Sequence, residues 1–463
     1  MTQAAFRPPA PPPRVLPPNA RPSPGAYMRY FKIMARNPLE IWTEGHFNKL
    51  THLDSIFGRD YAIIHDPKAI RHFLVTNEKN YRLTNIRRAV FEPVTGQGIF
   101  VAEGENWKRT RRALTPVFTP RHVQGFGRAM INKSVEAVDA ISSRLDEVVN
   151  ISDQMTQLTL NILLACLFSG DQKLDAKRFA NDLERLFEKA GMPHPFDLME
   201  APRWMPRVGR GGALRIVADL RRQVASIALA RKRLVATGGE APEDFLTLLL
   251  RAGQDTGEPL SEDEVIDNLL TFLAAGHETT ARSLAWTFYL LANSPDNLRR
   301  AETEIDAATL NINEPAKWGD ELLFLTAVIK ESMRLYPAAP ILSRTAIGKD
   351  KLGDLSIDAG TEVVVSTWVL HRHRKLWRDP DNFDPTRFLG DEGKAIDRFA
   401  YLPFGAGPRV CIGASFAMQE MVIAMATLLK ELRFLPALGE EPQPVMRITL
   451  QPSTPIKLRV EAR

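Results

Sequence analysis

The spacing of apolar and polar residues predicts a chain in which helices dominate. From about Trp107 to Leu335, apolar residues recur every three or four positions, which is typical of amphipathic helices. The apolar run 414–432 predicts another helix near the end of the sequence. Strand patterns are fewer. One covers 58–67, just before a helical pattern at 67–75, and others lie between Leu342 and Thr367.

Together these patterns predict a mainly α, α+β fold with a small β-rich region. Residues 379–393 are rich in Pro, Asp and Gly and predict a loop. Residues 1–25 are proline-rich, so we expect a disordered or extended arm there. No composition change marks a linker after it, and residues 26–463 are expected to form a single domain.

The longest helical pattern runs from Ser261 to Ala292. Ser261 with Glu264 three residues later predicts a capping box at its start, and the sequence Asn-Ser-Pro after Ala292 predicts its end. Its centre reads AAGHETT, although glycine in a helix interior costs about 1 kcal/mol relative to alanine. We therefore expect a close approach or a local distortion near Gly276.

Charge, apolar runs and cysteine content limit the kinds of binding partner and the cellular compartments that are plausible for this protein. The formal charge is +5, but no dense Lys/Arg block with interleaved aromatic residues argues for nucleic acid. A basic face for an acidic protein partner is an alternative. No stretch reaches the roughly 18 apolar residues of a membrane span, so a soluble protein is expected. With only Cys166 and Cys411, a disulfide scaffold is implausible and a cytoplasmic location fits best.

Cys411 lies in the stretch FGAGPRVCIG, residues 404–413. From the residues alone it could be a structural cysteine, a nucleophile or a single thiolate ligand to a metal cofactor. Zinc is disfavoured because the chain has no paired cysteines or histidine cluster in the sequence. The glycines at 405, 407 and 413 would let the backbone approach a flat ligand. The following helix would present its N-terminus to the sulfur and lower the pKa of the thiol.

This stretch resembles the haem-binding loop of the cytochrome P-450 family. The pattern is matched by Phe404, Gly407, Arg409, Cys411 and Gly413. The resemblance implies haem b with Cys411 as the axial ligand of its iron, and makes Phe404, Arg409 and Gly413 cofactor-binding residues. It also implies that haem lies between the long central helix and the helix that follows Cys411.

The centre of the long helix resembles the oxygen-activating segment of the same family. The resemblance makes Thr279 and Glu278 catalytic, as a hydroxyl and a carboxylate that deliver protons. It implies that Gly276 lets the helix open over the cofactor and that Ala275 leaves room beside it. His277 is expected to be structural. The plainer alternative is a polar patch on a solvated helix face, but the apolar flanks argue against it.

Three further segments look like motifs of the family. Glu331 and Arg334 match its Glu-x-x-Arg motif, and Arg387 matches the usual third member of a structural trio. As a lone pair, the first two would more often be a surface salt bridge. Trp107 and Arg111, four apart on one helix face, match residues that bond a haem propionate. Arg344 matches another propionate-binding arginine, although either arginine alone would more often be solvated.

The resemblance implies a monooxygenase that inserts one atom of dioxygen into a lipophilic small molecule by hydroxylation or epoxidation. NAD(P)H would supply electrons indirectly, through a ferredoxin or flavodoxin with its reductase. A peroxide-driven peroxygenase and a non-catalytic haem sensor or carrier remain as alternatives. We expect a monomer. The substrate stays open, and residues 91–101, 186–205 and Ile341 are expected to line its pocket.

Overall fold

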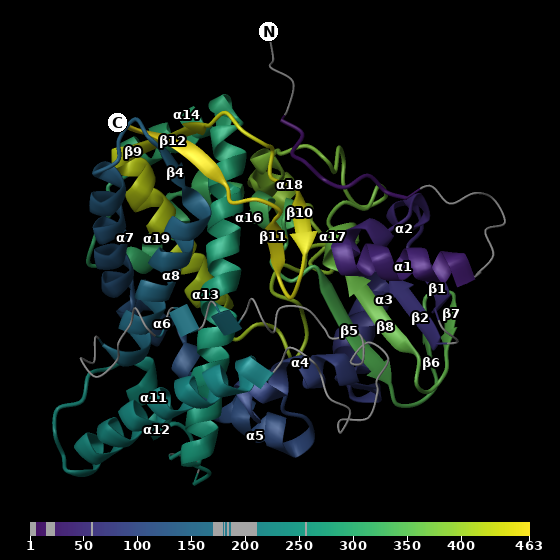
Figure 1. Ribbon diagram of the computed structural model, residues 1–463, viewed down its shortest axis with the longest axis horizontal. Coiled ribbons are helices and arrows are strands. Elements are labelled where there is room, and N and C mark those ends of the chain that lie inside the picture. The colour runs from purple at the N-terminus through teal and green to yellow at the C-terminus, as the bar shows by residue number, and fades with distance from the viewer. Residues whose placement is uncertain are drawn as a thin grey trace.

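The computed structural model describes residues 6–14, 24–56, 59–169, 211–254 and 257–463, together with 179, 181–182 and 185–186. Most of these residues are helical, and a smaller region carries a five-stranded sheet (Figure 1). The mainly α fold with a small β-rich region is therefore confirmed.

Helix α13 (Glu262–Ala292) runs through the helix-rich part of the molecule (Figure 1). It begins with the predicted capping box: the Glu264 backbone N–H donates to Ser261 Oγ at 3.3 Å, and the Ser261 N–H donates to Glu264 Oε2 at 2.8 Å. Helices α8 (Ile151–Phe168) and α16 (Leu323–Leu335) pack against it. As a result, nearly every residue of its second half is buried.

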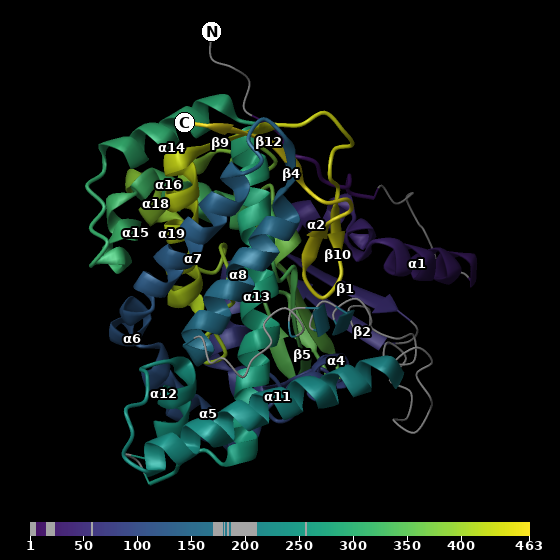
Figure 2. The ribbon, with the colours of Figure 1, turned by 60° about the vertical axis from the view of Figure 1, so that its left-hand side comes forward.

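Helix α19 (Ala414–Glu431), which follows Cys411, packs against α7 (Gly127–Ser142), α13 and α16. Figure 2 shows α7, α8 and α13 running together while α11 crosses below them. The other helices of this part are α5 (Gly104–Leu114), α6 (Pro120–Gly125), α11 (Gly211–Ala236), α12 (Phe245–Arg251), α14 (Pro295–Ala307) and α15 (Trp318–Glu321).

The five-stranded sheet has the order β1-β2-β8-β5-β3. Strands β2 and β8 pair in parallel, and each of the other neighbouring pairs is antiparallel. The sheet contains both regions in which strands were predicted. Its strands are β1 (Thr51–Ile56), β2 (Arg59–Ile64), β3 (Tyr81–Arg82), β5 (Ile341–Ala346) and β8 (Glu362–Ser366).

The described chain has three further small sheets and six further α-helices. A three-stranded sheet has the order β4-β12-β9, and β6-β7 and β10-β11 are hairpins. The strands are β4 (Val148–Asn150), β6 (Asp350–Leu352), β7 (Leu355–Ile357), β9 (Leu432–Pro436), β10 (Pro444–Met446), β11 (Leu450–Pro452) and β12 (Lys457–Ala462). The helices are α1 (Pro24–Arg36), α2 (Glu44–Asn48), α3 (Pro67–Arg71), α4 (Asn85–Thr95), α17 (Thr367–Leu370) and α18 (Gly390–Ala395).

The prediction of a plain loop at 379–393 is partly wrong. A 3-10 turn, η6 (Pro385–Phe388), and helix α18 lie within it. Asp384 caps the turn, since its side chain accepts the Thr386 N–H at 3.1 Å, and Pro385 suits the first position of a helix.

Residues 6–14 of the proline-rich segment are extended and lie against the core. The Phe383 N–H donates to the Phe6 carbonyl oxygen at 2.8 Å, and the Tyr336 hydroxyl donates to the Pro9 carbonyl oxygen at 2.9 Å. Residues 1–5 and 15–23 lie outside the described residues. The division into an arm and one domain stays a prediction.

Candidate functional site

The loop that carries Cys411 folds tightly before α19. The Cys411 N–H donates to the Phe404 carbonyl oxygen at 3.0 Å. Gly405 and Gly407 adopt φ values of +73° and +76°, which favour glycine. A Cβ on Gly407 would lie 1.9 Å from the carbonyl oxygen of Leu74. At Gly407 the loop therefore approaches the protein backbone at Leu74. The sequence had led us to expect an approach to a flat ligand instead.

Gly413 differs from these two glycines. Its φ is −89°, and an added Cβ would meet only Phe118 Cε1, at 3.8 Å. The protein around position 413 would thus accept a methyl group. Gly413 is the N-cap of α19, and its backbone N–H donates to the sulfur of Cys411. The helix N-terminus therefore meets the sulfur as the sequence led us to expect.

The Cys411 side chain is exposed, although protein atoms crowd the sulfur on its other sides. That crowding raises the pKa of the thiol. The Gly413 N–H and the positive charge of Arg111 lower it, but burial outweighs both. In its protein surroundings alone, the thiol does not show the lowered pKa that we predicted from the helix N-terminus.

The middle of α13 presents small and polar residues to an accessible space. Ala275 is exposed and Thr279 is partly exposed, one helical turn apart, while most of the helix after them is buried. Thr279 Oγ1 donates to the Ala275 carbonyl oxygen at 2.7 Å. The helix is continuous through Gly276, so the opening expected there is not seen between residues 262 and 292.

Glu278 is buried and holds a different set of partners from Thr279. Its Oε1 accepts hydrogen bonds from Thr449 Oγ1 at 2.9 Å and from Gln451 Nε2 at 2.7 Å. These donors belong to the β10-β11 hairpin region. Successive residues on a helix diverge by about 100°. The two predicted catalytic side chains are therefore neighbours in sequence that make separate contacts.

His277 lies inside the helix packing. Burial, and then the charge of Arg282, lower its pKa to about 4. The imidazole is therefore neutral at ordinary pH. The His277 carbonyl oxygen accepts a hydrogen bond from Thr159 Oγ1 at 3.2 Å. These are the surroundings of a packing residue.

The three arginines predicted to bind the cofactor, Arg111, Arg344 and Arg409, differ in their contacts. Arg111 Nη1 donates to the Val410 carbonyl oxygen at 3.1 Å, beside Cys411. Arg409 lies over the Trp107 ring, with its guanidinium carbon 4.4 Å from the ring centroid. Arg344 is partly buried, and the loss of solvent around its guanidinium, followed by the charge of Arg409, lowers its pKa to about 10. Arg344 and Arg409 are thus close enough to repel one another.

Arg87 joins this group, and sequence reasoning missed it. Burial, then Arg344 and Arg409, lower its pKa well below the usual value. Glu103 is the acid that raises the pKa of Arg87. Its carboxylate already accepts the Leu83 backbone N–H at 2.7 Å and forms an ion pair with Arg88. The Arg-Arg pair just before the expected pocket segment 91–101 was the available signal.

Glu331, Arg334 and Arg387 meet in one buried network. Arg334 Nε lies 2.7 Å from Glu331 Oε2, and Arg387 Nε lies 3.1 Å from Glu331 Oε1. Arg334 also donates to the carbonyl oxygens of His371 and Pro380, each at 2.7 Å. This pairing and hydrogen bonding offset the cost of burying the three charges, so the loss of any one partner would leave a buried charge uncompensated.

The network continues to the cysteine loop through His371. Burial, Arg334 and Arg372 lower the pKa of His371 to about 3, so its ring is neutral. Its Nε2 accepts the Leu402 backbone N–H at 2.8 Å. Leu402 stands two residues before Phe404, where the loop begins. The trio therefore supports the cysteine loop through one shared histidine.

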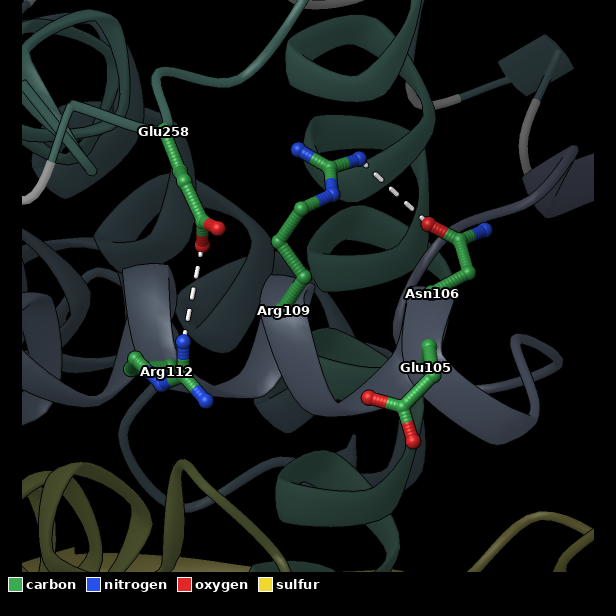
Figure 3. Close-up of a pocket in the computed structure, with 5 residues that line it drawn as sticks. All are labelled: Glu105, Asn106, Arg109, Arg112 and Glu258. Carbon is green, nitrogen blue, oxygen red and sulfur yellow. Dashed lines mark hydrogen bonds and ion pairs between the residues drawn. The ribbon is translucent and has the colours of Figure 1, made fainter.

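A surface pocket of about 300 Å³ lies on the outer side of α5 (Figure 3). Its lining side chains mostly bond one another: Arg112 Nη1 lies 3.5 Å from Glu258 Oε2, and Arg109 Nη2 lies 3.4 Å from Asn106 Oδ1. Arg109 also pairs with Glu264. This charged pocket is separate from the predicted site.

Among the described residues, His46, His52 and Asp54 could offer metal-ligand atoms, which lie within 4.8 Å of one another. Both ring nitrogens of His46 already have partners. Nε2 lies 3.3 Å from Asp54 Oδ2, and Nδ1 accepts the Thr43 N–H at 3.1 Å at the start of α2. We assign no metal to this cluster.

Comparison with known proteins identifies the family. The family model described as Cytochrome P450 matches residues 55–460. The chain belongs to the cytochrome P450 family. It is 31% identical over 441 residues to Protein LUTEIN DEFICIENT 5, chloroplastic, of Arabidopsis thaliana, covering 88% of this chain and 71% of the relative. It is 32% identical over 393 residues to cyclooctat-9-en-7-ol 5-monooxygenase of Streptomyces melanosporofaciens, covering 82% of each.

The fold agrees with this membership. The crystal structure of the cytochrome P450DA heme domain superimposes with a TM-score of 0.77 over 100% of this chain and 99% of that one. At 23% identity, this likeness shows the shared fold. No described helix of this P450 is long and apolar enough to cross a membrane.

This P450 is a haem-thiolate monooxygenase, as its family membership shows. The family implies haem with a cysteine thiolate ligand, a substrate, dioxygen and a source of electrons. The residues fit such a cofactor. The Cys411 sulfur is accessible and accepts a backbone N–H. Three arginines, Arg87, Arg344 and Arg409, lie together, and the acids that face them are Glu78 and Glu103.

Proposed function

We propose that this P450 inserts one atom of dioxygen into a lipophilic small molecule, by hydroxylation or epoxidation, and that Cys411 is the thiolate ligand of haem b. The observation that carries the proposal is the accessible Cys411 sulfur that accepts the Gly413 N–H beside Arg111. Bound haem would activate dioxygen, and donation from the thiolate favours O–O cleavage.

The arginines of this site fall into two groups, one that would bind the propionates and one that lies beside the cysteine loop. Arg344 and Arg409, with the Trp107 ring under Arg409, suit charge-assisted bonds to the two propionates. Arg111 donates to Val410 and lies near the Cys411 sulfur. Its charge would stabilise the thiolate, so we assign it to the cysteine loop in place of the predicted propionate role.

Thr279 and Glu278 would supply protons. The Thr279 hydroxyl is partly exposed on the face of α13 that carries Ala275, so it can exchange a proton with water or substrate there. Glu278 is held by Thr449 and Gln451, and must rotate away from them or act through water to reach that hydroxyl. We therefore assign to Thr279 the direct transfer of a proton, and to Glu278 the supply of protons to Thr279.

A ferredoxin or flavodoxin with an NAD(P)H-dependent reductase would deliver the electrons. Exposed Arg112, Arg121 and Arg128 lie on α5, α6 and α7. These helices flank the cysteine loop: Arg111 of α5 bonds Val410, and Gln419 of α19 bonds the carbonyl oxygen of Val123 in α6. This basic surface suits an acidic carrier. A monomer in the cytoplasm, where thiols stay reduced, remains our expectation.

Product formation with two electron sources tests the proposal. With NAD(P)H, a reductase and a carrier, we expect hydroxylated or epoxidised product, and faster turnover than with hydrogen peroxide alone. Charge reversal of Arg112, Arg121 and Arg128 to Glu should slow reduction by the carrier, while Arg233→Glu on the far end of α11 should not. Faster turnover with peroxide would contradict the carrier, and no product with either source would contradict the oxygenation.

A further inference from the structure

The carbonyl oxygen that confines Gly407 belongs to Leu74, which lies in a five-residue π-helical turn, η2 (His72–Thr76). Such turns are rare and are found frequently at functional sites. The Asn77 N–H closes this one by donating to the His72 carbonyl oxygen at 2.8 Å. Because fixing the backbone costs conformational entropy at every residue, a turn of this length needs support from other segments. The position of the Leu74 carbonyl is therefore set by those contacts.

A single carboxylate, that of Asp350 in β6, binds side chains on both sides of η2. Its Oδ1 lies 3.0 Å from His72 Nε2, and its Oδ2 accepts from Asn77 Nδ2 at 3.0 Å and from the Tyr81 hydroxyl at 2.5 Å. The Lys351 N–H donates to Oδ1 at 2.8 Å. His72 is the first residue of η2 and Asn77 follows the last, so both ends of the turn are held to one group.

The Asp350 carboxylate stays ionised in this position. Its side chain is 10% exposed, and burial alone would raise its pKa. The hydrogen bonds from Tyr81, the Lys351 N–H, Asn77 and His72 outweigh burial and lower the pKa below the usual value. Hydrogen bonds to an ionised acceptor are roughly twice as strong as those between neutral groups. The charge of Asp350 therefore contributes directly to the hold on η2.

The same turn lies against the loop that carries Cys411. A Cβ on Gly407 would lie 1.9 Å from the Leu74 carbonyl oxygen and 3.6 Å from Val75 Cγ2. The Gly407 carbonyl oxygen accepts the Val410 N–H at 3.0 Å, one residue before Cys411. The η2 backbone thus lies where the loop turns towards the sulfur. If η2 shifted, the loop would gain room here, and the amides near the sulfur would be held less firmly.

We propose that Asp350 is a positioning residue for the Cys411 sulfur, acting through η2 and Gly407. Its donors fix η2, η2 confines the loop, and the loop holds the Gly413 N–H on the sulfur. Hydrogen bonds to the ligating atom are among the interactions that tune the potential of bound iron. The inference goes beyond the proposed function and rests on its assignment of Cys411 as the haem ligand.

Backbone hydrogen exchange in the holoenzyme tests this proposal, with Asp350→Asn as the variant because asparagine keeps the shape and loses the charge. We expect the amides of residues 405–413 to exchange at least threefold faster than in the wild type, and those of α8 to keep their rates. The midpoint potential of the haem should become more negative, because the sulfur keeps its N–H donor for less of the time. Tyr81→Phe, which removes one donor, should move both quantities less and in the same direction.

Glu302→Gln is the matched control. It neutralises a buried carboxylate that Arg433 bonds at 2.7 and 2.8 Å in another part of the fold. We expect it to lower the melting temperature and to change neither the exchange of 405–413 nor the midpoint potential. Arg111, the charge that faces the Cys411 sulfur, is the same in every variant.

Unchanged exchange of 405–413 in Asp350→Asn, or an equal change in Glu302→Gln, would overturn the inference. If Asp350→Asn does not retain haem, Tyr81→Phe decides by the same two measurements. The carbon-monoxide spectrum of the reduced wild type is recorded in parallel. A spectrum without thiolate ligation would contradict the proposed function and this inference with it. A thiolate spectrum with an unaltered loop in the variants would remove this inference alone.

Discussion

The Glu278 carboxylate accepts a hydrogen bond from the Gln451 side chain at 2.7 Å, joining the centre of α13 to a hairpin 173 residues further along the chain. Thr449 adds a second donor to the same oxygen at 2.9 Å. The hairpin therefore sets the position of a carboxylate that the family resemblance makes part of the proton supply. This connection links the C-terminal region to the chemistry of the central helix.

Glu278→Gln should slow product formation by about 100-fold, because an amide cannot carry a proton and acid–base groups typically contribute at least that factor. Its oxygen can still accept from Thr449 and Gln451, and only the long 3.8 Å ion pair with Arg282 is lost, so haem content and the melting temperature should change little. Gln451→Leu should have a smaller effect, about threefold to tenfold. Product per NAD(P)H consumed, measured against pH, checks both. An unchanged rate in Glu278→Gln would remove Glu278 from the mechanism.

Gly407→Ala should prevent the cysteine loop from closing, since a Cβ there would lie 1.9 Å from the Leu74 carbonyl oxygen and the φ of +76° is unfavourable for alanine. Gly413→Ala is the matched control, because its added Cβ meets only Phe118 at 3.8 Å. We expect haem content and the melting temperature to fall sharply in the first variant and slightly in the second. Equal losses in both would contradict the assigned cause.

Arg334→Leu should destabilise the protein by about 3–5 kcal/mol, as expected when one partner of a buried ion pair is removed. Glu331 would keep only Arg387 and the Asp384 N–H, and the His371 carbonyl oxygen would lose its donor. Urea unfolding measures the loss. Arg299→Leu, which breaks an exposed pair with Asp296, should change the free energy of unfolding by less than about 1 kcal/mol. Similar losses would mean that the trio is not the support of this region.

Stability should fall as the pH drops below the unfolded pKa of histidine. His277 has a folded pKa of about 4 against an ordinary value of 6.5, so between these limits the unfolded chain binds a proton that the folded chain does not. Its contribution is fully present above pH 6.5 and falls by about 1.4 kcal/mol per pH unit below it. His277→Leu should flatten the dependence of the urea midpoint on pH, and His122→Gln should not. A slope unaltered in His277→Leu would contradict this burial effect.

The sequence predicts those features that depend on residues close together in the chain, because their interactions follow from the spacing alone. The capping box at Ser261 and the helical period fixed the start and course of α13, and Glu331 with Arg334 lie one turn apart by sequence alone. The partners of Glu278 and the carbonyl that crowds Gly407 come from distant segments, so no local pattern announces them. The pocket range 186–205 lies outside the described residues except for Leu186, which is buried.

Arg87 shows a second limit. A pair of arginines in an amphipathic helix is usually solvated, and only tertiary packing separates the two. Arg88 pairs with Glu103, while Arg87 is directed onto the Phe100 ring. The order of charged residues in the sequence therefore does not show which of the two arginines pairs with an acid in the fold.

The carbon-monoxide difference spectrum of the reduced protein tests the assignment of Cys411 most directly. The wild type should give the red-shifted band of thiolate-ligated haem, and Cys411→Ser should lose it although Cys166 remains. An imidazole-type spectrum in the wild type, or the thiolate band retained in Cys411→Ser, would contradict the account.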